Sequence, residues 1–142
     1  MVKVERSITI NAPVEKVFAY VTDPTNEPEF VPGMTDVRNV RGLGVGQTND
    51  WTYKMLGIPL NGKSEVTEYK ANERYVTKSS GGIVSNWTWT FKTEARVTQV
   101  NLVVDYTIPV PVLGKLGERL VLRQNEREAD LAMATLKDRL EG

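Results

Sequence analysis

Near Pro111 the hydrophobic pattern changes from a period of two residues to a helical period. From about residue 35 to residue 109, apolar residues alternate with polar ones, which is typical of half-buried strands. No proline follows Pro111, and the pattern favours one helix of about 28 residues, roughly 40 Å long at 1.5 Å per residue. Because the chain before this helix is mostly strand-like, the pattern predicts that the helix packs on a sheet and covers it.

The chain before Pro111 predicts two short helices and a seven-stranded antiparallel sheet. The first strand is expected at residues 2–10, and an amphipathic helix then begins near Pro13 and ends by Asp23. Prolines on both sides restrict the next segment to about one helical turn, anchored by Phe30. Short turns then join the remaining strands into antiparallel hairpins. These strands are expected near residues 35–41, 46–56, 60–70, 73–80, 83–93 and 97–109.

Composition excludes several classes of function. Lys and Arg together number 18, as do Asp and Glu, so the chain lacks the basic field that holds nucleic acid. It has no Cys and no His, which excludes disulfides, thiolate or imidazole metal sites and Ser-His-Asp catalysis. No stretch approaches the ~18 apolar residues of a membrane span, and no signal peptide is apparent. We expect one domain over residues 1–142, cytoplasmic, with no cofactor, metal, nucleic acid or transmembrane segment.

The segment SNWTWTFKTE, residues 85–94, places three aromatic side chains on one face of one strand. Two other strands have a matching apolar face by the same parity. Such aromatic residues either fill a core or form the wall of a pocket between sheet and helix. The residues on these faces are Trp51, Tyr53, Trp87, Trp89, Phe91, Leu102, Val104 and Tyr106.

The long helix offers a stripe that combines small, apolar and polar side chains. We expect four polar groups to point into the same space: the side chains of Asn125 and Glu126 and the hydroxyls of Tyr53 and Tyr106. Their convergence favours a pocket, because buried polar groups need partners. Glu126 is the best candidate for a catalytic acid or base, because a carboxyl group in an apolar pocket can exchange protons near neutral pH. Arg127 and Glu128 are expected to face solvent. The helix side of the predicted pocket comprises Leu122, Asn125, Glu126, Ala129 and Met133.

Three segments resemble the START/Bet v 1-like (SRPBCC) superfamily, in particular its polyketide cyclase/dehydrase and lipid-transport branch. ITINAPVEKVFAYVTDPTNEPEF resembles the opening strand and helix pair, and VRGLGVGQTNDWTY the glycine-spaced connection into the third strand. VPVLGKLGERLVLRQNEREADLAMATLKDRLE is similar to the closing helix, so the resemblance covers essentially the whole chain. It implies an α+β helix-grip fold, a curved seven-stranded sheet wrapped around the C-terminal helix and enclosing a hydrophobic cavity. It also implies lipid, sterol, quinone, hormone or polyketide ligands, with cyclisation or dehydration in a minority of members.

The sequence is compatible with three functions. The first is binding or transport of a small hydrophobic ligand, such as a lipid, a quinone or a polyketide-like molecule, by a monomer or weak homodimer. The second is a polyketide cyclase/dehydratase-like enzyme that uses Glu126 and tyrosine hydroxyls. The third is a protein-interaction module with a solid core and an apolar patch of Leu113, Leu116 and Leu120.

Overall fold

The elements occur in the predicted order. The computed structural model describes residues 2–55, 57–107 and 114–142, with side chains for residues 3–55, 57–107 and 122–142. The helices are α1 (Val14–Val21), the 3-10 turn η1 (Pro24–Asn26), α2 (Glu27–Phe30) and α3 (Gly114–Glu141). The strands are β1 (Val2–Ile10), β2 (Met34–Arg41), β3 (Thr48–Met55), β4 (Ile58–Lys70), β5 (Arg74–Gly81), β6 (Val84–Glu94) and β7 (Val97–Thr107).

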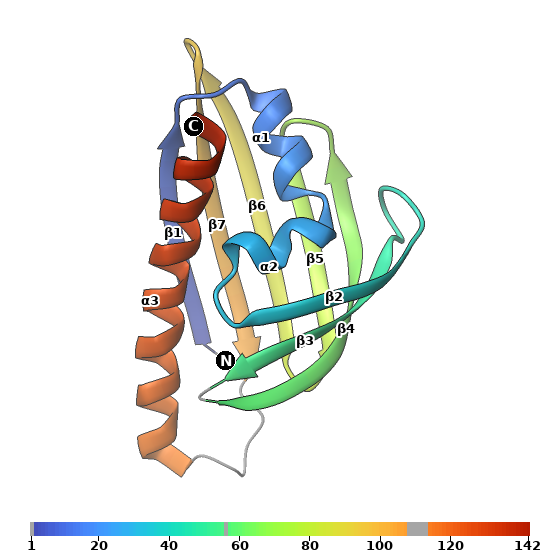
Figure 1. Ribbon diagram of the computed structural model, residues 1–142, viewed down its shortest axis with the longest axis vertical. Coiled ribbons are helices and arrows are strands. Elements are labelled where there is room, and N and C mark those ends of the chain that lie inside the picture. Colours follow the sequence, from blue (N-terminus) through green and yellow to red (C-terminus); the bar gives the residue numbers. More distant parts are fainter. Residues whose placement is uncertain (1, 56, 108–113) are drawn as a thin grey trace.

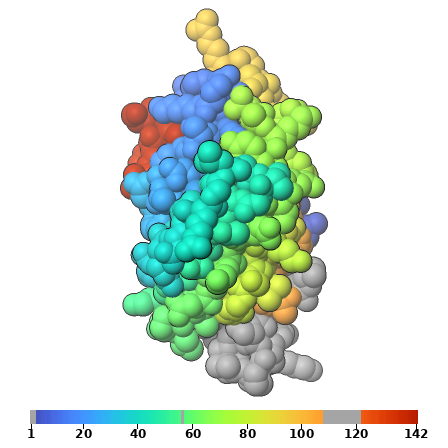
Figure 2. Space-filling view, turned by 90° about the vertical axis from the view of Figure 1, so that its right-hand side faces the viewer, coloured from blue at the N-terminus to red at the C-terminus, as the bar shows by residue number. Residues whose placement is uncertain are grey.

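The strands form one antiparallel sheet in the order β1-β7-β6-β5-β4-β3-β2. The sheet curves so that β2 and β3 cross in front of the other strands, and α3 runs along β1 (Figure 1). Helices α1 and α2 lie on the same side of the sheet (Figure 1). Figure 2 shows the β2–β3 hairpin at the centre of another face, below α1. The predicted α+β helix-grip fold is confirmed.

The first helix forms where an apolar stripe and a proline coincide. Pro13 precedes α1 with φ −67°, and the stripe at Val14, Val17 and Phe18 is buried. The helix ends at Val21, and the hydroxyl of the following Thr22 donates to the carbonyl of Phe18 at 2.8 Å. Helix α2 is a single turn with Pro28 as its second residue and Pro32 shortly after its end, and its apolar anchor Phe30 is buried as predicted.

Cross-strand register brings the aromatic faces together on the inner side of the sheet. Trp89 lies opposite Leu102, and Trp87 lies opposite Val104, so the faces of β6 and β7 form one surface. On β3, Trp51 lies opposite Gly62 of β4. A Cβ atom at residue 62 would overlap the indole ring of Trp51, so glycine is required for the ring to lie there.

Two clusters of buried apolar residues occupy the space between sheet and helices. One contains the apolar face of α1 and the last turns of α3, and the other contains Trp51, Tyr53 and Tyr106. Polar contacts also hold α3 to β1, since Arg6 pairs with Asp130 at 2.6 Å. Within the described residues, no helix is long and apolar enough to cross a membrane. The patch predicted at Leu113, Leu116 and Leu120 lies outside the residues whose side chains are described.

Candidate functional site

A cavity of about 110 Å³ lies between the sheet, α2 and α3. Members of both buried clusters contribute to its wall, so the cavity lies where the two clusters meet. Its wall is predominantly apolar and aromatic, as in most small-molecule sites. The wall includes these residues predicted from strand parity and helix phase: Trp51, Tyr53, Trp87, Trp89, Leu102, Val104, Tyr106, Asn125 and Ala129.

The other four predicted residues are not part of this wall. Phe91 is buried against Phe18, with ring centroids 5.2 Å apart in an edge-to-face arrangement. Met133 is buried in the same cluster, and Leu122 packs against the cluster of Trp51, Tyr53 and Tyr106. Glu126 is half-buried outside the wall. On β6 the cavity therefore occupies only part of the face predicted from strand parity.

The prediction that Glu128 faces solvent is wrong. The helix contributes Asn125, Glu128, Ala129 and Ala132 to the wall, at spacings of three and four residues. The centre of this face is rotated by roughly 50° from the predicted stripe, at 100° per residue. The predicted stripe follows the apolar residues of α3, which pack into the core, and the cavity lies beside that stripe.

Glu128 interacts with a tyrosine across the cavity wall. Tyr53 donates its hydroxyl hydrogen to one carboxylate oxygen of Glu128, and Gln124 donates to the other oxygen at 3.2 Å. Burial raises the pKa of Glu128, and the two donors oppose that rise because they stabilise the charged form. Burial, together with the neighbouring carboxylate, also raises the pKa of Tyr53. This pair joins the sheet to α3 through a charge-assisted hydrogen bond.

The hydroxyl group of Tyr106 is buried in the wall and makes no hydrogen bond of normal geometry within the described residues, although the side chain of Asn125 lies near enough to oppose the rise in its pKa. The residue is 5% exposed, and burial raises its pKa. A buried hydroxyl without a partner costs free energy, so this group is available to a ligand atom that donates or accepts a hydrogen.

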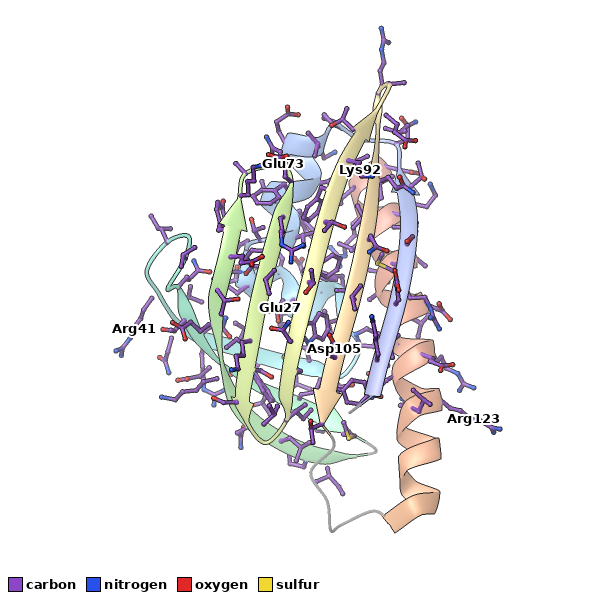
Figure 3. The ribbon with its side chains drawn as sticks, turned by 180° about the vertical axis from the view of Figure 1, so that it is seen from behind. Glu27, Arg41, Glu73, Lys92, Asp105 and Arg123 are labelled. Carbon is purple, nitrogen blue, oxygen red and sulfur yellow. The ribbon has the colours of Figure 1, made fainter. Side chains whose placement is uncertain are left out.

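Glu27 is a second carboxyl group in the wall, and no pattern in the sequence indicated it. It is the first residue of α2, and Figure 3 places it behind the middle of the sheet, beneath β5 and β6. Burial raises its pKa to about 7. Its charge also adds to the effect of burial in raising the pKa of the nearby Tyr75. The pattern Glu-Pro-Glu-Phe does not distinguish Glu27 from Glu29, which lies outside and pairs with Arg139 at 3.3 Å.

A sequence profile described as polyketide cyclase / dehydrase and lipid transport matches residues 1–141. The chain belongs to this family. Within the SRPBCC/Bet v 1-like superfamily it is also similar in fold to the protein TTHA0849 from Thermus thermophilus, with a TM-score of 0.85 and 22% identity. That alignment covers 98% of this chain and 97% of the other. The Zhui aromatase/cyclase from Streptomyces sp. R1128 aligns with a TM-score of 0.79 and 18% identity, over 99% of this chain and 93% of the other.

Among curated relatives, the uncharacterized protein Rv0088 of Mycobacterium tuberculosis H37Rv is 31% identical over 108 residues. The match covers 73% of this chain and 47% of the relative, so the chain spans about half the length of the curated relatives it matches. The family includes cyclases and lipid-transport proteins, and a shared fold does not choose between them.

This family member also has a group of hydroxyls on the sheet side of its cavity, which the sequence reasoning missed. Ser79 Oγ lies 2.5 Å from Ser85 Oγ and donates to the carbonyl of Ile83 at 2.9 Å. Ser64 and Thr77 belong to the same part of the wall. Strand parity places these side chains on the inner face of the sheet, but an apolar pattern does not select serine residues. They give the cavity a polar side opposite α3.

Proposed function

We propose that the chain binds a small hydrophobic molecule, such as a lipid, a quinone or a polyketide-like compound, in the cavity between the sheet and α3. The observation that carries this proposal is the predominantly apolar cavity of about 110 Å³ with a few polar groups in its wall. By the 10–15 Å³ that one water needs, it accommodates on the order of ten non-hydrogen atoms. That size suits a single ring or the end of a chain. Membership of a family that includes lipid-transport proteins supports the same function.

The tryptophans provide a direct assay of cavity binding. The chain has three tryptophans, Trp51, Trp87 and Trp89, and all three contribute to the wall. Protein labelled with 5-fluorotryptophan therefore reports only from the cavity in ¹⁹F NMR. We expect titration with 2-phenylethanol, a neutral molecule of suitable size, to shift these resonances and reach saturation.

A matched pair of substitutions on α3 separates cavity binding from surface binding. Ala129 is part of the wall, and Ala134 is exposed on the same helix. Ala129→Phe places a ring in the cavity and is expected to weaken 2-phenylethanol binding at least about tenfold, because it removes the space for the ligand. Ala134→Phe is expected to leave the binding curve unchanged. Equal binding by both variants, or no saturable shift in the unsubstituted protein, would contradict the proposal.

The hydrogen-bonded pair of Tyr53 and Glu128 favours a second candidate function, that of a cyclase/dehydratase-like enzyme. A half-buried carboxylate beside an apolar cavity is a suitable base for removing a proton next to a carbonyl group. Glu128 takes the role that the sequence analysis assigned to Glu126, because only Glu128 belongs to the wall.

Heptane-2,6-dione tests this second candidate. Removal of an α proton by the carboxylate gives an enolate that attacks the second carbonyl, and loss of water then leaves 3-methylcyclohex-2-enone. Formation of the enone is followed by its ultraviolet absorbance. If the protein is an enzyme of this class, it forms the enone faster than the background reaction. The Glu128→Gln variant then loses this activity, and the Glu126→Gln variant keeps it. A rate that is the same with and without protein would exclude this function for simple diketones.

A further inference from the structure

Among the described residues, the cavity wall contains acidic side chains but no basic ones. Glu27 and Glu128 contribute carboxyl groups, while no Lys or Arg is found among the described residues of the wall. A ligand with a carboxylate or phosphate would therefore be buried beside negative groups without a counter-charge. The wall thus disfavours anionic ligands and leaves neutral or cationic ones.

The two carboxyl groups differ in their partners. Glu128 already accepts hydrogen bonds from Tyr53 and Gln124. The side chain of Glu27 has no hydrogen-bond or ion-pair partner within the described residues, although it contributes to the wall. Because an ionised carboxylate in an apolar environment is stabilised mainly by a paired cation, Glu27 is the position at which a ligand cation gains most.

The aromatic side chains of the wall suit a cationic ligand as well. The faces of aromatic rings attract ammonium groups, with the strongest effect at tryptophan. Phe30 belongs to the same one-turn helix as Glu27, and its ring centroid lies 6.2 Å from that of Trp89. Tyr75, another aromatic residue of the wall, lies near enough to Glu27 for the carboxyl charge to raise its pKa. The aromatic residues of the wall are Phe30, Trp51, Tyr53, Tyr75, Trp87, Trp89 and Tyr106.

We infer that the preferred ligands of the cavity are amphipathic amines of about ten non-hydrogen atoms, whose ammonium group pairs with Glu27 while a ring or short chain packs among the aromatic side chains. This inference rests on the proposed function and names the ligand class of the same site. It also distinguishes this cavity from one that holds fatty acids, which requires a basic group or a neutral polar end to receive the carboxylate.

Three probes of nearly equal size test the inference by ¹⁹F NMR of 5-fluorotryptophan-labelled protein. They are 2-phenylethylamine, 2-phenylethanol and phenylacetate, which are cationic, neutral and anionic. Titrations are made at pH 8, above the pKa of about 7 that burial gives Glu27. We expect the amine to bind at least about tenfold more tightly than the alcohol, since a charge-assisted contact contributes about 1.5–3 kcal/mol. Phenylacetate is expected to bind more weakly than either.

Glu27→Gln is expected to weaken amine binding about tenfold and so to remove the preference for the amine over the alcohol. Glu29→Gln, two residues later on the exposed side of α2, removes the same charge outside the cavity and is expected to change neither. Loss of the amine preference in Glu128→Gln instead of Glu27→Gln would overturn the assignment to Glu27.

The outcomes also separate this inference from the proposed function. If the alcohol binds and the amine binds no better, the amine inference is wrong and ligand binding in the cavity stands. If phenylacetate binds best, the charge reasoning is wrong. If none of the three probes gives a saturable shift, both the inference and the proposed function fail.

Discussion

Glu27→Gln is expected to make the protein more stable at alkaline pH and to leave it unchanged in acid. Burial raises the pKa of Glu27 from the ordinary 4.5 to about 7 in the folded protein. Well below pH 4.5 the carboxyl is protonated in both the folded and the unfolded chain, so its ionisation does not change the free energy of unfolding. Between pH 4.5 and 7 the carboxyl ionises in the unfolded chain but stays protonated in the folded one, so the folded state loses about 3 kcal/mol of stability, at about 1.4 kcal/mol per pKa unit. Glutamine does not ionise and avoids this cost.

Urea unfolding followed by tryptophan fluorescence measures the effect at pH 4, 6 and 8. The difference in free energy of unfolding between Glu27→Gln and the unsubstituted protein is expected to rise from near zero at pH 4 to about 3 kcal/mol at pH 8. Glu29→Gln serves as control for the loss of one negative charge on the same helix. A difference that is constant across this range, or a variant less stable at pH 8, would refute a desolvated carboxyl at Glu27.

Two further substitutions test the packing of the buried interior. Thr98→Val is expected to cost about 1–2 kcal/mol of unfolding free energy, because the fully buried hydroxyl donates to the carbonyl of Ala12 at 2.8 Å. Thr93→Val, at an exposed position, is the control, and equal losses in urea unfolding would contradict the prediction. Gly62→Ala is expected to cost about 1–3 kcal/mol and to shift the ¹⁹F resonance of Trp51, since the new methyl group overlaps the indole ring. An unchanged resonance and stability would show that the ring does not lie across β4.

The order of the elements could be predicted from the sequence because local signals specify it. Alternation identified the strands to within a few residues, and prolines limited both short helices. The buried stripe of α1 and the anchor Phe30 follow directly from spacing, so these predictions are confirmed. The resemblance to the family pointed to the same fold, which the profile match and the sheet order confirm.

The candidate site could be predicted only in part, because a cavity is defined by how elements pack. Parity placed Trp89 and Phe91 on the same face, yet Phe91 meets α1 and Trp89 meets the cavity. Residue spacing alone does not predict which of these two side chains meets the cavity. Likewise, the apolar stripe of α3 predicts its core-facing side, whereas the wall uses the adjacent side with Glu128.

Glu27 illustrates the same limit for charged residues. A glutamate in a one-turn helix between prolines is expected to be solvated, and its exposed neighbour Glu29 meets that expectation. The curvature of the sheet and the position of α2 bring Glu27 over the cavity instead. Contacts between segments distant in sequence decide this placement, and a single sequence does not encode them in a local pattern.

A crystal structure of the protein soaked in 2-phenylethanol tests cavity binding most directly. The expected result is electron density for the ring between Trp51, Trp89 and Ala129, with the hydroxyl within hydrogen-bond distance of a polar group of the wall. Side chains that close the space between the sheet and α3, or a ligand found only on the outer surface, would contradict binding in this cavity.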